Sequence, residues 1–191
     1  MWKFRKLEKG SPIIDPHEFE FFKSIDLPAA VTREAIQNSL DAKLTNNFKV
    51  KVSIEFLKLD YSTVRKFFKG LGPHLTACGI PFDEEKQGTF DCLLIEDFGT
   101  KGLTGDVTEI GSQDTTENNF FNFWYGEGFS FKTGKYAGRW GLGKTTFHFA
   151  SQIKTFFAYS IRNNDRQKLL MGKFFFKSHK VDNDIYRYFG Y

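Results

Sequence analysis

The stretch REAIQNSLDA, from Arg33 to Ala42, combines the spacing of a helix with a carboxylate and an amide on one face. It belongs to the segment Ala29–Ala42, which follows Pro28 and has the spacing of a helix. Glu34 and Asn38 are four residues apart, so one helical face presents a carboxylate beside a neutral amide. A carboxylate can activate water, and an amide oxygen can ligate Mg²⁺ without adding charge near phosphates. Taken alone, however, such a pair is more commonly a solvated helix face.

A second stretch, LIEDFGTKG, covers Leu94–Gly102. The apolar run Phe90–Ile95 predicts a strand, and Asp97 and Gly99 follow it closely. An Asp-x-Gly after a strand places a carboxylate at the carboxyl end of that strand, where ligands bind in α/β proteins. The glycines permit close approach of a ligand. By itself, the stretch is equally typical of a tight turn closed by an aspartate hydrogen bond.

The third stretch, GRWGLGKT, covers Gly138–Thr145. A glycine-rich loop that runs into a helix start binds anions, because free backbone N–H groups point toward the phosphates. The spacing also satisfies the P-loop pattern, so a P-loop nucleotide hydrolase is an alternative. Two features disfavour it. The preceding FKTGKYA is not a buried strand, and the 46 residues after Thr145 are too few for the remaining strands of that fold.

The rest of the chain predicts a two-layer α/β domain. The expected elements are a strand at Phe48–Leu59, an interrupted helix at Tyr61–Ala77, a helix at Lys144–Ser151, and a hairpin of strands at Lys154–Ile161 and Leu169–Lys177. In the first helix, Ala29, Ile36 and Leu40 fall on one apolar stripe, opposite Glu34, Asn38 and Asp41. Gly99–Gly143 has no clean period, which is typical of a functional lid or of disorder.

Together the three stretches resemble the GHKL ATPase superfamily, which includes gyrase B, MutL, the ninety-kilodalton heat-shock chaperones, histidine kinases and the MORC ATPases. REAIQNSLDA is very similar to the N box of MutL and the chaperones, EDFGTKG resembles the Asp-x-Gly-x-Gly box, and GRWGLGK resembles the later glycine box. The resemblance implies a two-layer Bergerat sandwich, with a mixed β-sheet, helices on one face and a long ATP lid. It places the ATP-binding domain at residues 27–191, after an N-terminal extension at 1–26.

The resemblance also implies a role for individual residues. Glu34 would be the general base for water attack, Asn38 the Mg²⁺ ligand, and Asp97 the carboxylate that hydrogen-bonds the adenine amino group. The other implied ATP contacts are Asp41 and Ala42 at the base, Gly99 and Gly102 where the lid begins, and Gly138, Gly141, Leu142, Gly143, Lys144 and Thr145 along the phosphates.

This sequence departs from the family pattern at two points. The second box is one residue longer than usual at Gly102. A threonine that the family carries near the adenine has no counterpart before Tyr191, so we expect either a chain that continues or a subfamily variation. Histidine kinases lack a water-activating glutamate at the place of Glu34, and this favours a hydrolytic switch. A nucleotide-gated interaction module with negligible turnover remains the alternative.

Composition adds expectations about location and partners. Residues 81–117 carry ten acidic and two basic side chains, whereas 132–180 carry eleven basic and one acidic. The basic block could meet a nucleic acid, although a solvated face is the simpler interpretation. The chain has no apolar run long enough for a membrane span or signal peptide, and two cysteines, so a cytoplasmic location is expected. The histidines and cysteines have no zinc-ligand spacing.

The family resemblance implies homodimerisation when ATP binds. It also suggests that the lid closes over the nucleotide. The lid contains an aromatic cluster, Phe120, Phe121, Phe123, Trp124 and Tyr125. Such a cluster could stack on a base, but packing against a core or a partner subunit is the favoured interpretation.

Overall fold

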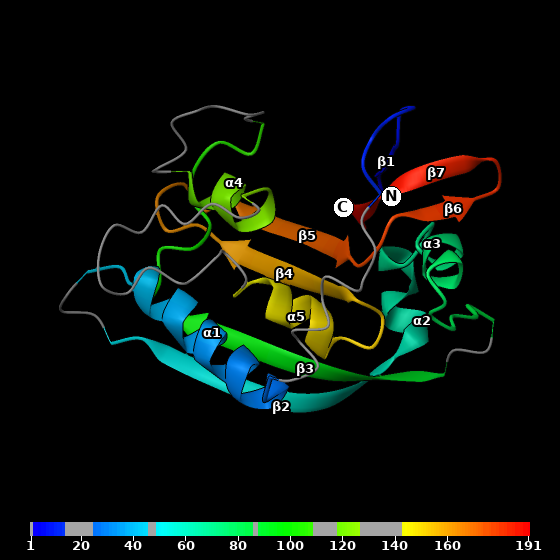
Figure 1. Ribbon diagram of the computed structural model, residues 1–191. Coiled ribbons are helices and arrows are strands. Elements are labelled where there is room, and N and C mark those ends of the chain that lie inside the picture. Colours follow the sequence, from blue (N-terminus) through cyan, green and yellow to red (C-terminus); the bar gives the residue numbers. More distant parts are fainter. Residues whose placement is uncertain (1, 14–24, 46–48, 86–87, 109–117, 127–142) are drawn as a thin grey trace.

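The computed structural model describes residues 2–13, 25–45, 49–85, 88–108, 118–126 and 143–191 (Figure 1). The helices are α1 (Leu27–Asp41), α2 (Tyr61–Val64), α3 (Gly72–Ala77), α4 (Asn119–Trp124) and α5 (Thr145–Ala150), with a 3₁₀ turn at Arg65–Phe67. The strands are β1 (Phe4–Lys6), β2 (Lys51–Asp60), β3 (Thr89–Phe98), β4 (Thr155–Ile161), β5 (Lys168–Phe175), β6 (His179–Val181) and β7 (Asp184–Gly190). No helix in these ranges is long and apolar enough to cross a membrane.

The strands form two sheets in the described part of the chain. One has the order β1-β7-β5-β4, with β6 also paired to β7, and the other is the ribbon β2-β3. All of these pairings are antiparallel, whereas the family resemblance implies a mixed sheet. The reason is that β4 and β5, and β6 and β7, are joined by short turns that reverse the chain. The two sheets approach each other where β3 and β4 end: Asn163 N donates to Lys101 O at 3.1 Å, and Leu103 N donates to Ser160 Oγ at 2.8 Å.

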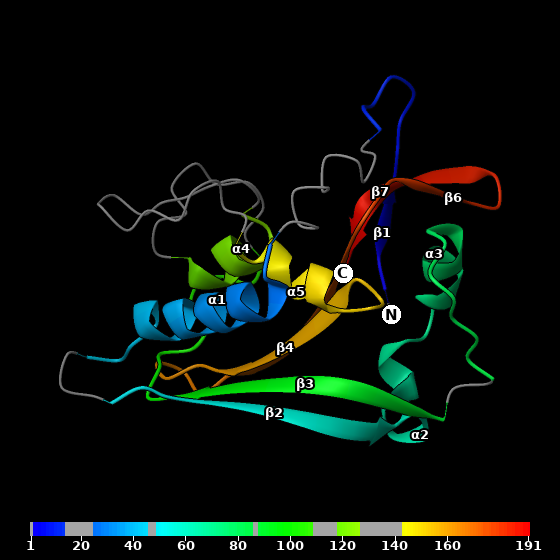
Figure 2. The ribbon, with the colours of Figure 1, turned by 60° about the horizontal axis from the view of Figure 1, so that its bottom comes forward.

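Helices α1, α4 and α5 lie on the same side of strands β2, β3 and β4 (Figure 2). The predicted helix Ala29–Ala42 is confirmed as α1, which begins after Asp26; the Asp26 side chain accepts a hydrogen bond from Ala29 N at 3.1 Å. The buried positions of α1 are Val31, Ala35 and Ser39. The stripe seen in the sequence is not the buried one, because Ile36 and Leu40 are 42% and 51% exposed. Small residues on the inner side allow α1 to pack closely against α5 and β3.

The hydrophobic core lies where α3 meets the larger sheet. Its buried members are Tyr61, Phe68, Leu71, Leu75, Cys78 and Phe174, with Trp2 and Phe4 packed against them. The predicted Tyr61–Ala77 helix is divided into α2, the 3₁₀ turn and α3, because Gly70 adopts φ +87° and Pro73 starts a new helix. Strand β1 pairs with β7, so residues before α1 contribute to the same core.

Helix α4 lies within the segment expected to be a lid. Its side chains Phe120 and Trp124 are buried, and Trp124 stacks on Phe156 of β4 with a centroid distance of 5.5 Å. The packing interpretation of the aromatic cluster is therefore confirmed for these two residues. Tyr125 is 36% exposed and contacts Tyr191.

A buried histidine of α5, His148, predicts acid sensitivity. Burial lowers the pKa of His148 from 6.5 to about 3, and the nearby ammonium groups of Lys173 and Lys154 act in the same direction. The unfolded chain therefore binds more protons between pH 6.5 and 3, so stability is complete above pH 6.5 and is lost as the pH falls toward 3. We expect the free energy of unfolding, measured by urea titration, to fall by a few kcal/mol over this range. His148→Phe should remove the part of this pH dependence that His148 contributes, whereas His74, whose pKa is lowered to about 4 by burial and by the neighbouring His179, keeps its own part. An unchanged profile in the variant would assign the acid sensitivity elsewhere, for example to His74.

Candidate functional site

The carboxyl ends of α1 and β3 are joined at Asp97. Ser39 Oγ lies 3.0 Å from Asp97 Oδ2, and Thr100 Oγ1 donates to Asp97 Oδ1 at 3.0 Å. Backbone hydrogen bonds support this arrangement, from Lys101 N to Ala42 O at 2.8 Å and from Leu44 N to Gly99 O at 3.1 Å. The first two sequence stretches thus lie side by side, with an oriented carboxylate exposed between them.

Ser39 is a site residue that the sequence analysis missed. It is 3% exposed, and its hydroxyl lies between Ala35 O at 2.9 Å and Asp97 Oδ2. A hydroxyl donates one proton, so Ser39 can donate to only one of these acceptors at a time. Its position one turn after Ala35 places it on the inner face of α1, but its contact with Asp97 spans 58 residues and has no local signal in the sequence.

Gly143, just before α5, lies against Glu34 of α1. Gly143 lies so close that a methyl group built on it would overlap the Glu34 carboxylate. Asn38 Nδ2 donates to Glu34 Oε1 at 3.1 Å, so the predicted carboxylate–amide pair is in contact. This bond uses the amide nitrogen and leaves the amide oxygen, the atom that can ligate Mg²⁺, outside the contact. The two side chains are half-buried.

Two glycines shape the chain after β3. Gly99 adopts φ +81° and passes against the backbone of Lys49, where a Cβ would overlap Lys49 O. Gly102 adopts φ +73°, and a Cβ there would lie 2.7 Å from Ile161 O. Both positions therefore require glycine, because side chains rarely adopt this φ and the neighbouring backbone cannot move aside cheaply. In the structure Gly102 packs against the end of β4.

The third stretch is described in part. Gly143, Lys144 and Thr145 are described, whereas Gly138, Gly141 and Leu142 lie outside the described residues. Thr145 is the first residue of α5. The Lys144 ammonium donates to the backbone oxygens of Asn122 and Gly126, the latter at 2.9 Å. Lys144 is thus held by the end of α4 in this structure.

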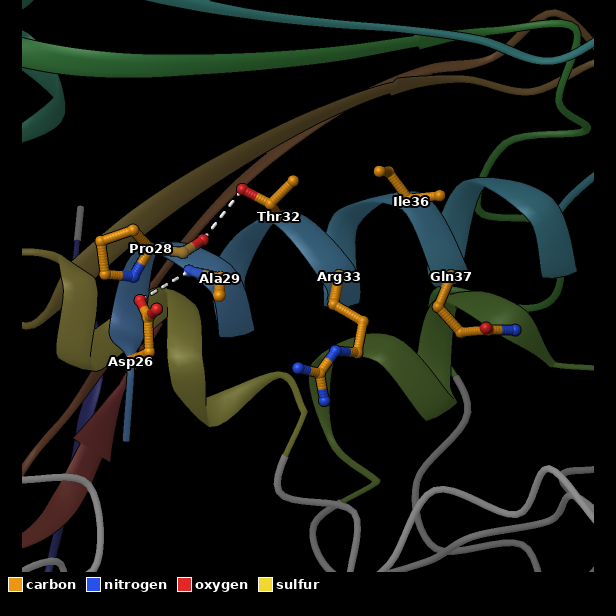
Figure 3. A pocket seen from close by; sticks show the side chains of 7 residues that line it. All are labelled: Asp26, Pro28, Ala29, Thr32, Arg33, Ile36 and Gln37. Carbon is orange, nitrogen blue, oxygen red and sulfur yellow. Dashed lines mark hydrogen bonds between the residues drawn. The ribbon is translucent and has the colours of Figure 1, made fainter. Parts of the chain in front are cut away.

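An open hollow of about 640 Å³ lies on the outside of α1 (Figure 3). The residues that line it are Asp26, Pro28, Ala29, Thr32, Arg33, Ile36 and Gln37. Thr32 and Ile36 point to one side of the helix, and Arg33 and Gln37 point to the other. Glu34, Asn38 and Asp97 do not line this hollow. It does not coincide with the candidate site.

Several cations of the basic block are used inside the fold. Lys173 is 6% exposed and donates to Trp124 O at 2.8 Å, and Arg162 pairs with Asp165 at 3.1 Å. Lys154 Nζ lies 3.4 Å from Phe149 O and 3.3 Å from Ser151 O, at the end of α5. These charges stabilise helix ends and a turn. Part of the positive charge that suggested a nucleic-acid partner therefore has a structural use.

Comparisons of the chain with protein-family models, curated protein sequences and solved structures found no match. Among the described residues, no group of three or more histidine, cysteine, aspartate or glutamate side chains gathers as a metal would require.

Proposed function

We propose that this chain is a Mg²⁺-dependent ATP-binding and ATP-hydrolysing module of the GHKL type. The observation that carries the proposal is the convergence of the three stretches on α1. Ser39 of this helix meets Asp97, and Glu34 meets Gly143. A carboxylate at a strand end and a carboxylate–amide pair beside Gly143 are thereby brought to one helix, α1. These groups match the two ends of a nucleotide, the base and the phosphates.

In this proposal each end of the nucleotide has its own set of residues. Asp97, held by Ser39 and Thr100, accepts a hydrogen bond from the adenine amino group, beside Asp41 and Ala42. Asn38 ligates Mg²⁺ on the phosphates through its amide oxygen. Glu34 takes a proton from the attacking water. The backbone N–H groups of the glycine stretch that ends at Thr145 bind the phosphates.

The P-loop alternative has less support. A P-loop fold uses parallel strands, and the strand pairings of the described residues are antiparallel. The lysine that a P-loop directs to the phosphates would be Lys144, which here binds the carbonyls of α4. A module that binds ATP without turning it over uses the same residues as the proposed hydrolase. A steady-state phosphate-release assay distinguishes the two.

We further propose that the module acts as a conformational switch in the cytoplasm and forms a homodimer when ATP binds. Sedimentation with and without a non-hydrolysable ATP analogue tests the dimer. A sedimentation coefficient unchanged by saturating analogue would exclude it.

The Asp97→Asn variant tests nucleotide binding. Asparagine has nearly the same shape, but an N–H₂ group replaces one of the two carboxylate oxygens. An N–H₂ group donates hydrogen bonds and cannot accept them, so the variant loses one accepting atom and the negative charge. Calorimetric titration should show ATP affinity lowered by about 10–100-fold, the usual cost of a lost charged hydrogen bond. Asp91→Asn is the matched control, because Asp91 lies on the same strand and pairs with Lys58 at the surface. If Lys144→Ala abolishes binding and Asp97→Asn leaves it unchanged, the P-loop interpretation replaces this one.

Gly143→Ala tests the position of the proposed base. The added methyl group should push the Glu34 carboxylate aside, because this flexible side chain is the group that can yield. We expect hydrolysis to slow by about 10–100-fold while ATP binding changes little, since small displacements of catalytic groups have effects of this size. Single-turnover phosphate release and calorimetry measure the two quantities. A parental rate of hydrolysis in this variant would show that the contact between Gly143 and Glu34 has no part in catalysis.

A further inference from the structure

Strand β2 lies at the margin of the molecule, and among the described residues only one of its two edges is paired. Figure 1 and Figure 2 both show β3 between β2 and the larger sheet, and β3 is the only described strand that pairs with β2. The pairing runs over all ten residues, Lys51–Asp60, in a regular register without a bulge. The strand contains no proline. It therefore lacks the bulge, the proline and the short length that commonly protect an edge strand.

One face of the β2–β3 ribbon carries an exposed apolar patch. The register places four apolar side chains on this face: Ile54, Phe56, Leu93 and Ile95. Phe56 is 86% exposed, the largest fraction for any large apolar side chain of the described residues, and Ile54 is 40% exposed. An apolar patch beside an open strand edge is typical of a surface that a partner covers.

The other face of β2 carries two opposite charges four residues apart, Lys51 and Glu55. Both side chains are exposed. The Lys51 ammonium lies 5.5 Å from the centre of the Phe98 ring, and Glu55 accepts a hydrogen bond from Ser53 at 3.2 Å. Ser53 is the midpoint between the two charges. A two-fold axis at Ser53 would therefore place each Lys51 opposite Glu55 of a second, antiparallel copy.

We propose that β2 pairs antiparallel with β2 of a second copy of this chain, about a two-fold axis at Ser53. This homodimer forms without nucleotide, so the inference goes beyond the proposed function. Antiparallel pairing of two identical strands is self-complementary, as the interface of a two-fold dimer must be. It also turns a two-stranded ribbon, which is marginally stable on its own, into a four-stranded sheet in the order β3-β2-β2-β3.

Both faces of β2 support this register. On the charged face, Lys51 lies opposite Glu55 of the second copy, and the symmetry repeats the pair. The apolar pairs on the other face are Val52 with Ile54 and Val50 with Phe56. An axis at Glu55 would instead place two carboxylates directly opposite each other, which is destabilising. A register shifted by one residue would put the apolar face of one copy beside the charged face of the other.

Sedimentation of charge variants without nucleotide tests the dimer. The parental protein should dimerise in a concentration series up to about 100 µM, since specific interfaces have Kd values in the micromolar range or below. Lys51→Glu leaves only carboxylates at the two facing positions, and Glu55→Lys leaves only ammonium groups. Each single variant should therefore dimerise about tenfold more weakly. The double variant should recover the parental affinity, and so should an equal mixture of the two single variants, because opposite charges face each other again.

Phe56→Ser tests the apolar face. The side chain is exposed in the single chain, so the variant should keep the parental circular dichroism and dimerise about 10–100-fold more weakly. Tyr159→Ser is the matched control, because Tyr159 is an aromatic residue of β4 that is 57% exposed, and it should leave the dimer unchanged. A parental protein that stays monomeric up to about 100 µM would overturn the inference. A dimer that both charge variants keep at parental affinity, or single variants whose mixture does not recover it, would overturn it as well.

Discussion

Replacing Glu34 with alanine should leave ATP binding nearly intact and lower the rate of hydrolysis by about 10²–10⁴-fold. The reason is that Glu34, the carboxylate that contacts Gly143 and is paired with Asn38, is the proposed base for the attacking water. A general base is needed when the proton leaves the water, but contributes little to binding of the ground state. The measurements are steady-state phosphate release and calorimetric titration of ATP.

Two further variants make this result interpretable. Glu34→Gln keeps the side chain that packs against Gly143 and removes its basicity, so it should lose turnover to a similar extent. Asn38→Ala should instead weaken Mg²⁺-dependent binding, because it removes the proposed metal ligand. If Glu34→Ala hydrolyses ATP at the parental rate, the catalytic assignment is wrong. The alternative of a non-hydrolytic module gains support if the parental protein itself shows no turnover but binds ATP.

The sequence predicts the elements of the candidate site better than it predicts the sheets. Helix α1, strand β3 and helix α5 appear where their patterns place them, because each has a local signal: a proline and helical spacing, an apolar run, or a glycine-rich start. The short strands β1, β6 and β7 have three to seven residues and are stabilised by pairing with one another. Strand β1 pairs with a strand about 180 residues away, which no local pattern encodes.

The distinction between local and long-range contacts also decides which side-chain contacts of the site could be predicted from the sequence. The Glu34–Asn38 contact is local, and the helical spacing is sufficient to predict it. Ser39 and Lys144 act over long range, toward Asp97 and toward α4. A serine in a helix or a lysine at a helix start is usually an ordinary surface or packing residue. The contacts of Ser39 and Lys144 are therefore seen only in the folded chain. The apolar stripe of α1 fails for a related reason, because close packing against α5 favours the small side chains Ala35 and Ser39 at the inner face.

Trp124→Ala should lower the free energy of unfolding by about 3–5 kcal/mol, the usual cost of removing a buried aromatic side chain. Trp124 is 1% exposed, stacks on Phe156 and lies edge-on to Phe123 with centroids 5.0 Å apart. Its removal leaves a cavity between α4 and β4 that the surrounding rings cannot fill without moving. Urea titration, followed by circular dichroism because the variant lacks a fluorescent reporter at this position, measures the loss.

Tyr125→Ala is the matched control, since it removes the next aromatic side chain of the same cluster. Tyr125 is 36% exposed, so its removal should cost clearly less than that of Trp124. Equal losses for the two variants would mean that α4 is not docked through Trp124 as the structure has it.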